Sequence, residues 1–530
     1  MRRHRSIWRS AFIVGITIGT AVLTGCTGAD SSGGGGDNLR YGYDLETQFT
    51  NTFDPGGENG STGDCDTIVT SFIYDGLLRR DQETGESIPG IATSWEVTGD
   101  EKRSITFHLR DDVEFSDGEK LDAAAVKASL DHNNENDQLS GLDHIDTVEV
   151  ADATTVIVNL KDDQSTPFIY NMGAGRDGQI LSPKSLKTAA KKPVGSGPFM
   201  LERFTPGQGI VLVKNPKYWD PKSYDFPGID FVQAGTGPPA VLRFKAGDLD
   251  LVRFEAESLP VLRKDANAKV VVKATEAYLQ FQFRLGYNDG RTTPFVNPLV
   301  RKAVRFAIDP VKINDLVQLG EGAIATQALP EESPGYNGEI ADDYAYDPDE
   351  AKRLLTEAGY PNGFEFTMVI PGPGIENMNR QGQLIQDMLG AVGITAKIVP
   401  VQGNDIATNY YISGGGDAFA AARLASSFYP GAYYDQFGKF QFVPLWNKAE
   451  RADIDDLTLR AQGSKDPAET ARLTQEAAKI VSDEALEVPI AFMPQFLATA
   501  KDRVGGIVGG QRNICDPPDL SGLKMKAGKE

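Results

Sequence analysis

Few side chains in this chain have the type and spacing that catalysis requires. Its 530 residues include four histidines, and no two of them stand at metal-ligand spacing, so a catalytic zinc site is not expected. The sequence contains no Gly-x-Ser-x-Gly nucleophile elbow and no phosphate loop ending in Gly-Lys-Ser/Thr. One Gly-x-Gly-x-x-Gly match, Gly173 to Gly178, lacks the strand before it and the helix after it that a dinucleotide site needs. We therefore predict a surface turn there, and no enzyme, cofactor or metal site.

Three cysteines carry the remaining reactive chemistry, and Cys26 has the most specific surroundings. Basic residues precede an apolar stretch of 13 residues, Ala11 to Leu23, which is too short to span a bilayer comfortably. The run Leu23-Thr24-Gly25-Cys26 closes it and looks like a bacterial lipoprotein export signal. We expect cleavage before Cys26, lipidation of this residue, and a soluble body anchored to the cell membrane on its extracytoplasmic side. An uncleaved membrane anchor or an ordinary secretory peptide is the alternative.

The other two cysteines, Cys65 and Cys515, stand near opposite ends of the mature chain. In an oxidising exterior, two leftover cysteines favour a disulfide, which would bring both ends into one lobe. Two buried, unpaired thiols are the alternative.

The length and charge of the chain limit which classes of protein it can belong to. A chain of 530 residues exceeds what one hydrophobic core usually organises, so two or more lobes are expected. It carries 53 basic and 74 acidic residues; without residues 1–25, which hold four arginines and no acids, the balance is 49 against 74, or −25. Such acidity disfavours nucleic-acid binding and mainly promotes solubility.

Strands and helices are expected to alternate along the body of the protein. Residues 38–110 and 145–160 show short runs of alternating apolar and polar residues, which predict strands. Further strands are expected over about 364–370 and 394–401. Capping residues and apolar spacing predict helices over about 122–132, 298–308, 348–358, 379–392 and 466–484. This pattern predicts a mixed α/β fold.

Several separated segments together resemble the peptide and nickel class of extracytoplasmic solute-binding proteins, the family that feeds ABC importers. Their order along the chain makes chance agreement improbable, and the most specific is Gly195-Ser196-Gly197-Pro198-Phe199, where small residues permit a tight turn. The segment 73–78 resembles a helix of that family. The segments are 51–55, 73–78, 89–95, 107–110, 115–118, 195–199 with Leu212, Asn215, Tyr218 and Trp219, 300–309 and 346–359.

The resemblance implies an α/β, two-lobe periplasmic-binding-protein-like clamshell with an extra subdomain on the first lobe. Carried onto this chain, it divides the residues into a signal peptide (1–25), a flexible tether (26–37), lobe one with the extra subdomain (38–283), lobe two (284–491) and a return to lobe one (492–530). A disulfide between Cys65 and Cys515 would be consistent with residues 492–530 lying in lobe one.

The resemblance also implies a ligand cleft between the lobes. The implied ligand contacts are Phe49, Thr50 and Asn51 from lobe one, and Arg423, Ser426, Ser427, Phe428, Tyr429, Tyr433 and Tyr434 from lobe two. Peptide binders of the family commonly carry a Trp and an Ala-Asp-Tyr run at the second place, whose aspartate pairs with the peptide amino terminus. This chain lacks that carboxylate and carries Arg423 instead, so free-amine peptides are not expected. Amine-blocked peptides, an anionic solute and an oligosaccharide remain open.

The expected function is therefore a lipid-anchored receptor of an ABC importer. We expect a monomer that captures a peptide-like or other oligomeric small solute by lobe closure and delivers it to membrane permease subunits. No nucleic acid is expected as a partner. The alternatives are a secreted hydrolase, and a surface adhesin or signalling protein that retains the fold.

Overall fold

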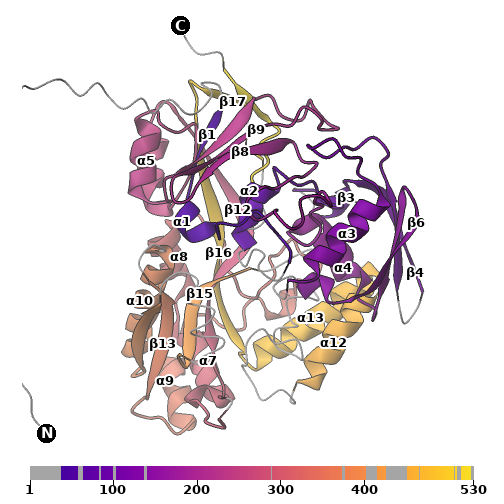
Figure 1. Cartoon of the computed structure of the whole chain (residues 1–530). Helices are drawn as coiled ribbons and strands as arrows, with labels where there is room; N and C mark the ends of the chain where they lie inside the picture. The colour runs from indigo at the N-terminus through magenta and orange to yellow at the C-terminus, as the bar shows by residue number, and fades with distance from the viewer. Residues whose placement is uncertain are drawn as a thin grey trace, which may run out of the picture. The chain divides into compact units, whose positions relative to one another are not determined.

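The computed structural model describes most of the chain after its first 37 residues (Figure 1). The described residues are 38–57, 64–82, 85–99, 103–136, 140–287, 289–372, 376–401, 415–424, 451–464, 466–506, 508–509 and 515–526. The expected signal peptide, Cys26 and the expected tether lie outside them. Within this described part, no helix is both long and apolar enough to cross a membrane.

A ten-stranded mixed sheet organises the fold, and its neighbouring strands come from distant parts of the sequence. β1 is parallel to β10 and β11, whereas β11 and β12 are antiparallel to β16. The predicted mixed α/β class is confirmed. From edge to edge the order is β14 (Thr395–Val401), β13 (Glu365–Pro371), β15 (Ala418–Leu424), β12 (Ala268–Phe283), β16 (Glu487–Ala500), β11 (Leu251–Phe254), β1 (Leu39–Tyr43), β10 (Gly228–Gln233), β9 (Gly209–Lys214) and β8 (Phe199–Thr205).

β12 and β16, of 16 and 14 residues, run side by side and belong to both halves of this sheet (Figure 1). The first part of β12, up to Ala274, pairs with the end of β16, which itself pairs with β11. After a register shift between Ala274 and Tyr278, β12 pairs with the start of β16 and with β15. The two halves of the sheet are therefore connected through the same pair of strands.

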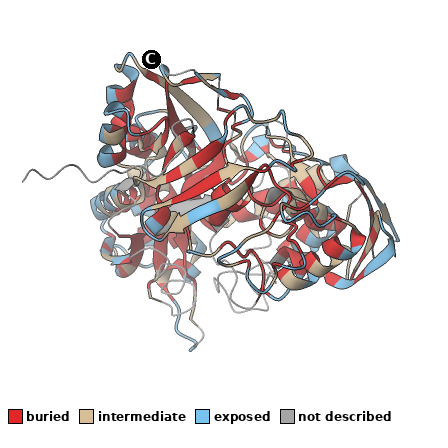
Figure 2. Cartoon of the chain, turned by 45° about the horizontal axis from the view of Figure 1, so that its top comes forward, coloured by how far each residue is buried: buried red, intermediate tan, exposed pale blue. Residues whose placement is uncertain are grey.

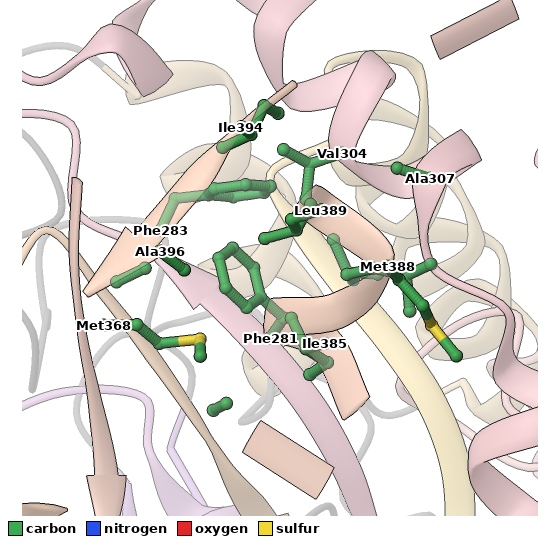
Figure 3. Close-up of a cluster of buried hydrophobic side chains, with 14 of the residues drawn as sticks. Phe281, Phe283, Val304, Ala307, Met368, Ile385, Met388, Leu389, Ile394 and Ala396 are labelled. Carbon is green, nitrogen blue, oxygen red and sulfur yellow. The ribbon is translucent and has the colours of Figure 1, made fainter. Parts of the chain in front are cut away.

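Helices cover both faces of the sheet on the β14–β15 side. Successive side chains of β12 point to opposite faces of the sheet. Leu279, Phe281 and Phe283 pack in one core, and Tyr278 packs in another. The Phe281 core, drawn in Figure 3, includes side chains of α7 (Pro298–Ala307), α8 (Pro310–Gln318), α9 (Pro348–Glu357) and α10 (Glu376–Ala391). The Tyr278 core includes side chains of α12 (Ala452–Gly463) and α13 (Pro467–Asp483).

On the β11–β8 side, alternate residues again point into two cores. Tyr41 and Tyr43 of β1 belong to the Tyr41 core, which also takes in Leu497 of β16 and, from the C-terminal segment, Leu520 and Leu523. That segment includes β18 (Leu523–Met525), paired with β17 (Val504–Gly506). The opposite face forms the Phe254 core, with α5 (Pro238–Lys245) and α6 (Leu259–Arg263). Strands in the middle of the sheet are largely buried, whereas exposed residues gather on outer helices and on the small sheet (Figure 2).

A separate four-stranded antiparallel sheet forms the extra subdomain. Its order is β4 (Ala92–Thr98), β5 (Ser104–Leu109), β7 (Thr155–Leu160) and β6 (Ile145–Asp152). The helices α3 (Ala123–Asn133) and α4 (Ser165–Ala174) contribute to its core around Phe107. At the Gly173 to Gly178 match, where a surface turn was predicted, Gly173 lies in α4, residues 175–178 form the bends and turn that follow, and Gly178 is buried.

Side-chain caps explain where four of the expected helices begin. The side chains of Asp122, Asn297, Asp347 and Asp466 each accept a hydrogen bond from a backbone amide of the helix that follows. The strands expected over 145–160, 364–370 and 394–401 form within one or two residues of these bounds.

One expected helix is wrong. Residues 73–78 form turns that lead into β2 (Leu78–Arg80), which pairs with β3 (Ser87–Pro89), and the short helix α2 (Thr67–Thr70) precedes them. The physical reason lies in the neighbouring chain. Gly197 and Phe199 donate backbone hydrogen bonds to the carbonyls of Ile73 and Phe72, so these groups are occupied outside a helix.

Candidate ligand-binding site

Phe49, Thr50 and Asn51 follow the short helix α1 (Leu45–Gln48) and differ in where their side chains lie. The Phe49 ring is 3% exposed and packs in the Tyr41 core, with its centroid 5.2 Å from that of Phe53. Thr50 is half-buried and Asn51 is exposed with a positive φ of 63°. Of the three predicted contacts, Asn51 is therefore exposed and Thr50 partly exposed, whereas Phe49 is buried.

Asp66 fixes the conformation of this loop. Its carboxylate, 0% exposed, accepts a hydrogen bond from the backbone amide of Thr50 at 2.7 Å and a second from the Thr50 hydroxyl. Charge-assisted hydrogen bonds of this kind are stronger than neutral ones. We call residues 49–51 with Asp66 the Thr50 loop.

Cys65, next to Asp66, is joined to Cys515 by a disulfide in the structure. The Thr67 hydroxyl also donates to the Cys515 carbonyl oxygen at 2.7 Å, and the Tyr43 hydroxyl donates to the Cys65 carbonyl oxygen at 3.0 Å. The C-terminal segment is thus attached covalently at the base of the Thr50 loop.

A polar pair lies on the two long strands, at the edge of the Tyr41 core. Lys273 of β12 is directly opposite Gln495 of β16 in the antiparallel register, so both side chains point to the same face. Val271 and Leu497 are also opposite each other, two residues away from Lys273 and Gln495, and they pack in the Tyr41 core. Because side chains alternate along a strand, Lys273 and Gln495 share the face of that core.

Gln495 is 3% exposed, yet neither its Nε2 nor its Oε1 has a hydrogen-bond partner in the described part of the protein. Lys273 is half-buried, and it pairs with no carboxylate among the described residues. A buried amide that lacks partners costs about 1–3 kcal/mol, so the two polar atoms of Gln495 require a partner that the described part of this chain does not supply.

Positive charge also reaches this face from β11. Arg253 is opposite Leu497 in the register and therefore points to the same face. Burial raises the pKa of Tyr41 to about 12, and the positive charge of Arg253 opposes that rise. Burial likewise raises the pKa of Tyr43, with Arg253 acting against the shift and Asp66 adding to it. Tyr43 therefore lies within electrostatic reach of both the Thr50 loop and Arg253.

The predicted contacts of the second lobe begin at the end of β15. The backbone of Arg423 is opposite Tyr278 of β12 in the antiparallel register. This position brings the start of the predicted segment to the strands that also carry Lys273 and Gln495. Ser426, Ser427, Phe428, Tyr429, Tyr433 and Tyr434 lie outside the described residues.

No group of three or more histidine, cysteine or acidic side chains suited to a metal occurs among the residues that the structure describes. The site described above presents hydroxyl, amide and ammonium groups, which are polar groups of the kind that orient small solutes in binding sites. It shows no nucleophile held against a base.

The family model of the bacterial extracellular solute-binding proteins, family 5 (middle region), matches residues 86–441. The chain belongs to this family. Its members are binding proteins, so this chain is a solute-binding protein and not an enzyme.

Comparison with individual proteins gives the same picture over nearly the full length. The glutathione-binding protein GsiB of Escherichia coli strain K12 is 27% identical over 523 residues, covering 94% of this chain and 96% of GsiB. Among solved structures, AgaA from A. tumefacien R10 in complex with agropinic acid superposes with a TM-score of 0.77 at 23% identity, covering 93% of this chain and 99% of AgaA. DppA from Helicobacter pylori in complex with the peptide STSA gives 0.76 at 23%, covering 93% and 98%. The periplasmic-binding-protein fold with an additional small sheet is therefore confirmed.

Three residues of the site were not predicted from the sequence. Asp66, Lys273 and Gln495 belong to no recognised motif, and their relation depends on which strands become neighbours. One signal was available for Gln495, because it is a polar residue inside a run that is otherwise strongly apolar.

Proposed function

We propose that this protein is the substrate-binding receptor of an ABC importer, anchored outside the membrane by lipid on Cys26. It captures a peptide-like or other oligomeric small solute and delivers it to a membrane permease. The observation that carries the proposal is the family match over residues 86–441. The expected division into lobe one (38–283 and 492–530) and lobe two (284–491) is part of the same proposal.

The long strands support a mechanism of capture by closure. β12 and β16 belong to both halves of the large sheet, so a ligand seated on them is close to residues from either half. A ligand that contacts both lobes stabilises the closed form relative to the open one. The permease then distinguishes the closed, loaded receptor from the open one.

Names of similar proteins support the ligand class. GsiB is a glutathione-binding protein, DppA was solved with the peptide STSA, and AgaA with agropinic acid. We propose a peptide-like solute for this chain as well. Because the segment 423–430 carries no carboxylate to meet a free ammonium group, we propose that the amino end of the solute is blocked.

Native mass spectrometry of the protein purified from its own host tests this proposal. The expected result is a small solute that stays bound to the folded protein and is released on unfolding. Membrane fractionation tests the anchor: the wild type should sediment with membranes, and Cys26→Ser should not. A solute import assay in a strain lacking the protein separates transport from an adhesive or signalling role. Normal uptake of the identified solute in that strain would refute the importer function.

A further inference from the structure

We infer that Gln495 and Lys273 form a specificity-determining pair that binds a solute in which an amide group stands next to a carboxylate. An amine-blocked peptide, whose last residue joins an amide to a free carboxylate, has this chemistry. The inference rests on the proposed function and adds the groups of the ligand that the protein recognises.

The amide of Gln495 supplies the first part of the argument. It offers one acceptor and two donor hydrogens, and both of its polar atoms lack partners among the described residues. This conclusion does not depend on which terminal atom is nitrogen, because both are unpartnered. A second amide presents a complementary donor and acceptor, so an amide of the ligand satisfies both atoms at once.

The ammonium of Lys273 supplies the second part. Within the described chain it has no acidic partner, and the one carboxylate of β12, Glu276, lies within the register shift between Ala274 and Tyr278. Arg253 adds a second positive charge on the same face. Without residues 1–25 the chain has 49 basic and 74 acidic residues. In so acidic a protein, a face with two cations favours a negatively charged group of the ligand.

The register sets the spacing of the two groups. Side chains directly opposite each other in an antiparallel pair have Cβ atoms about 4.5–5.5 Å apart. The amide and the ammonium therefore meet ligand groups that are close together, as the last amide and the carboxylate of a peptide are. A solute with an amide but no carboxylate contacts only Gln495, and a solute with a carboxylate but no amide contacts only Lys273.

The test measures binding of three matched peptide pools to the mature protein by isothermal titration calorimetry. The pools are N-acetylated di- and tripeptides, the same peptides with an amidated carboxyl end, and the same peptides with a free amine. We expect the N-acetylated acids to bind best and amidation to weaken binding at least tenfold. The variant Lys273→Gln should weaken binding of the acids about tenfold and leave the amidated pool unchanged.

Gln495→Leu should weaken both N-acetylated pools about tenfold. The same variant should keep or raise the melting temperature of the ligand-free protein, because it removes a buried amide that has no partner. A residue with a purely structural role would not show this combination. Lys269→Gln and Gln282→Leu are the matched controls, since both residues lie on β12 outside the pair, one as a second lysine and the other as a buried glutamine.

The outcomes separate this inference from the proposed function. If the wild type binds the pools and both variants bind them equally well, the inference is wrong and the proposed function stands. If Lys273→Gln weakens the amidated pool as much as the acids, the carboxylate assignment is wrong. If the wild type binds no pool while the solute found by native mass spectrometry binds and is not peptide-like, both the inference and the proposed ligand class are wrong.

Discussion

The buried carboxylate of Asp66 accepts two hydrogen bonds from Thr50, one from its backbone amide at 2.7 Å and one from its hydroxyl. This link joins the disulfide-bonded segment around Cys65 to the loop that presents Asn51 to the surface. The loop conformation thus depends on a residue that the sequence motifs do not include.

Replacing Asp66 should therefore both destabilise the protein and loosen its site. We expect Asp66→Ala to lower the free energy of unfolding by about 2–3 kcal/mol, because two hydrogen bonds to a charged group are lost. Thr50→Val removes only the hydroxyl bond and should cost about half as much. Urea unfolding measures both variants, and equal losses would show that the backbone bond contributes nothing.

The disulfide predicts a large dependence of stability on redox state. Cys65 and Cys515 are 450 residues apart in sequence. By the loop-entropy relation, closing so long a loop contributes up to about 6 kcal/mol. Guanidinium unfolding of the wild type should shift to lower denaturant on adding dithiothreitol. The double variant Cys65→Ser, Cys515→Ser should unfold at that lower midpoint with or without reductant; any reductant effect on it would point to another cause.

Asp75 connects two of the sequence motifs, and this connection can be tested. Its carboxylate accepts hydrogen bonds from Nε and Nη2 of Arg79 and from Nε1 of Trp219, the last at 2.7 Å. We expect Asp75→Asn to lower the free energy of unfolding by about 2–3 kcal/mol, since charged hydrogen bonds are lost in a largely buried place.

The matched control for Asp75 is Asp112→Asn. Asp112 also pairs with an arginine, Arg110, but its side chain is 56% exposed. Exposed ion pairs contribute about 0–1 kcal/mol, so this variant should unfold near the wild-type midpoint. Similar losses for the two variants would mean that burial of the Asp75 cluster is unimportant.

Some elements of the fold could be predicted from the sequence and others could not. Local signals were sufficient where a cap or a strand pattern decides the structure, as at Asp122 and Asn297. The resemblance to the family failed at residues 73–78, where the carbonyls of Phe72 and Ile73 are bonded to the distant 197–199 segment and not within a helix. A contact between segments more than 100 residues apart leaves no local trace.

The candidate site shows the same limit. The resemblance pointed to Thr50 and Asn51, and the register of β15 brings Arg423 to the long strands. The pairing of Lys273 with Gln495 could not be foreseen, because 222 residues separate them and only the antiparallel register of β12 and β16 places them opposite each other. Phe49, which lies in the same motif region, points into the core because its ring meets Phe53 and Phe204.

His132 predicts a pH dependence of stability. Its Nε2 lies 2.9 Å from Oδ1 of Asp54, and this hydrogen bond raises the pKa of His132 above its ordinary value although burial opposes the rise. A group whose pKa is higher in the folded state stabilises the fold fully below its unfolded pKa, about 6.5, and this contribution is lost as pH rises through the folded pKa.

Thermal unfolding between pH 5.5 and 8.5 measures this effect. The wild type should lose stability with rising pH in this range relative to His132→Gln, by less than about 1 kcal/mol. His144→Gln, which removes a histidine beside Asp162, is the control variant. A difference between wild type and His132→Gln that grows with rising pH has the wrong sign and would contradict the assignment.

The Gly195-Ser196-Gly197 motif gives the last prediction. A Cβ added at Gly195 would lie 2.1 Å from the Ile73 carbonyl oxygen and 2.6 Å from the Tyr74 ring, so the backbone must move to accommodate it. We expect Gly195→Ala to lower the free energy of unfolding by at least about 2 kcal/mol. At Gly175 no atom lies within 4 Å of an added Cβ and φ is −157°, which any residue adopts. Gly175→Ala should therefore stay within about 0.5 kcal/mol of the wild type. Comparable midpoints for the two variants in urea would show that close packing on Ile73 does not explain why glycine stands at position 195.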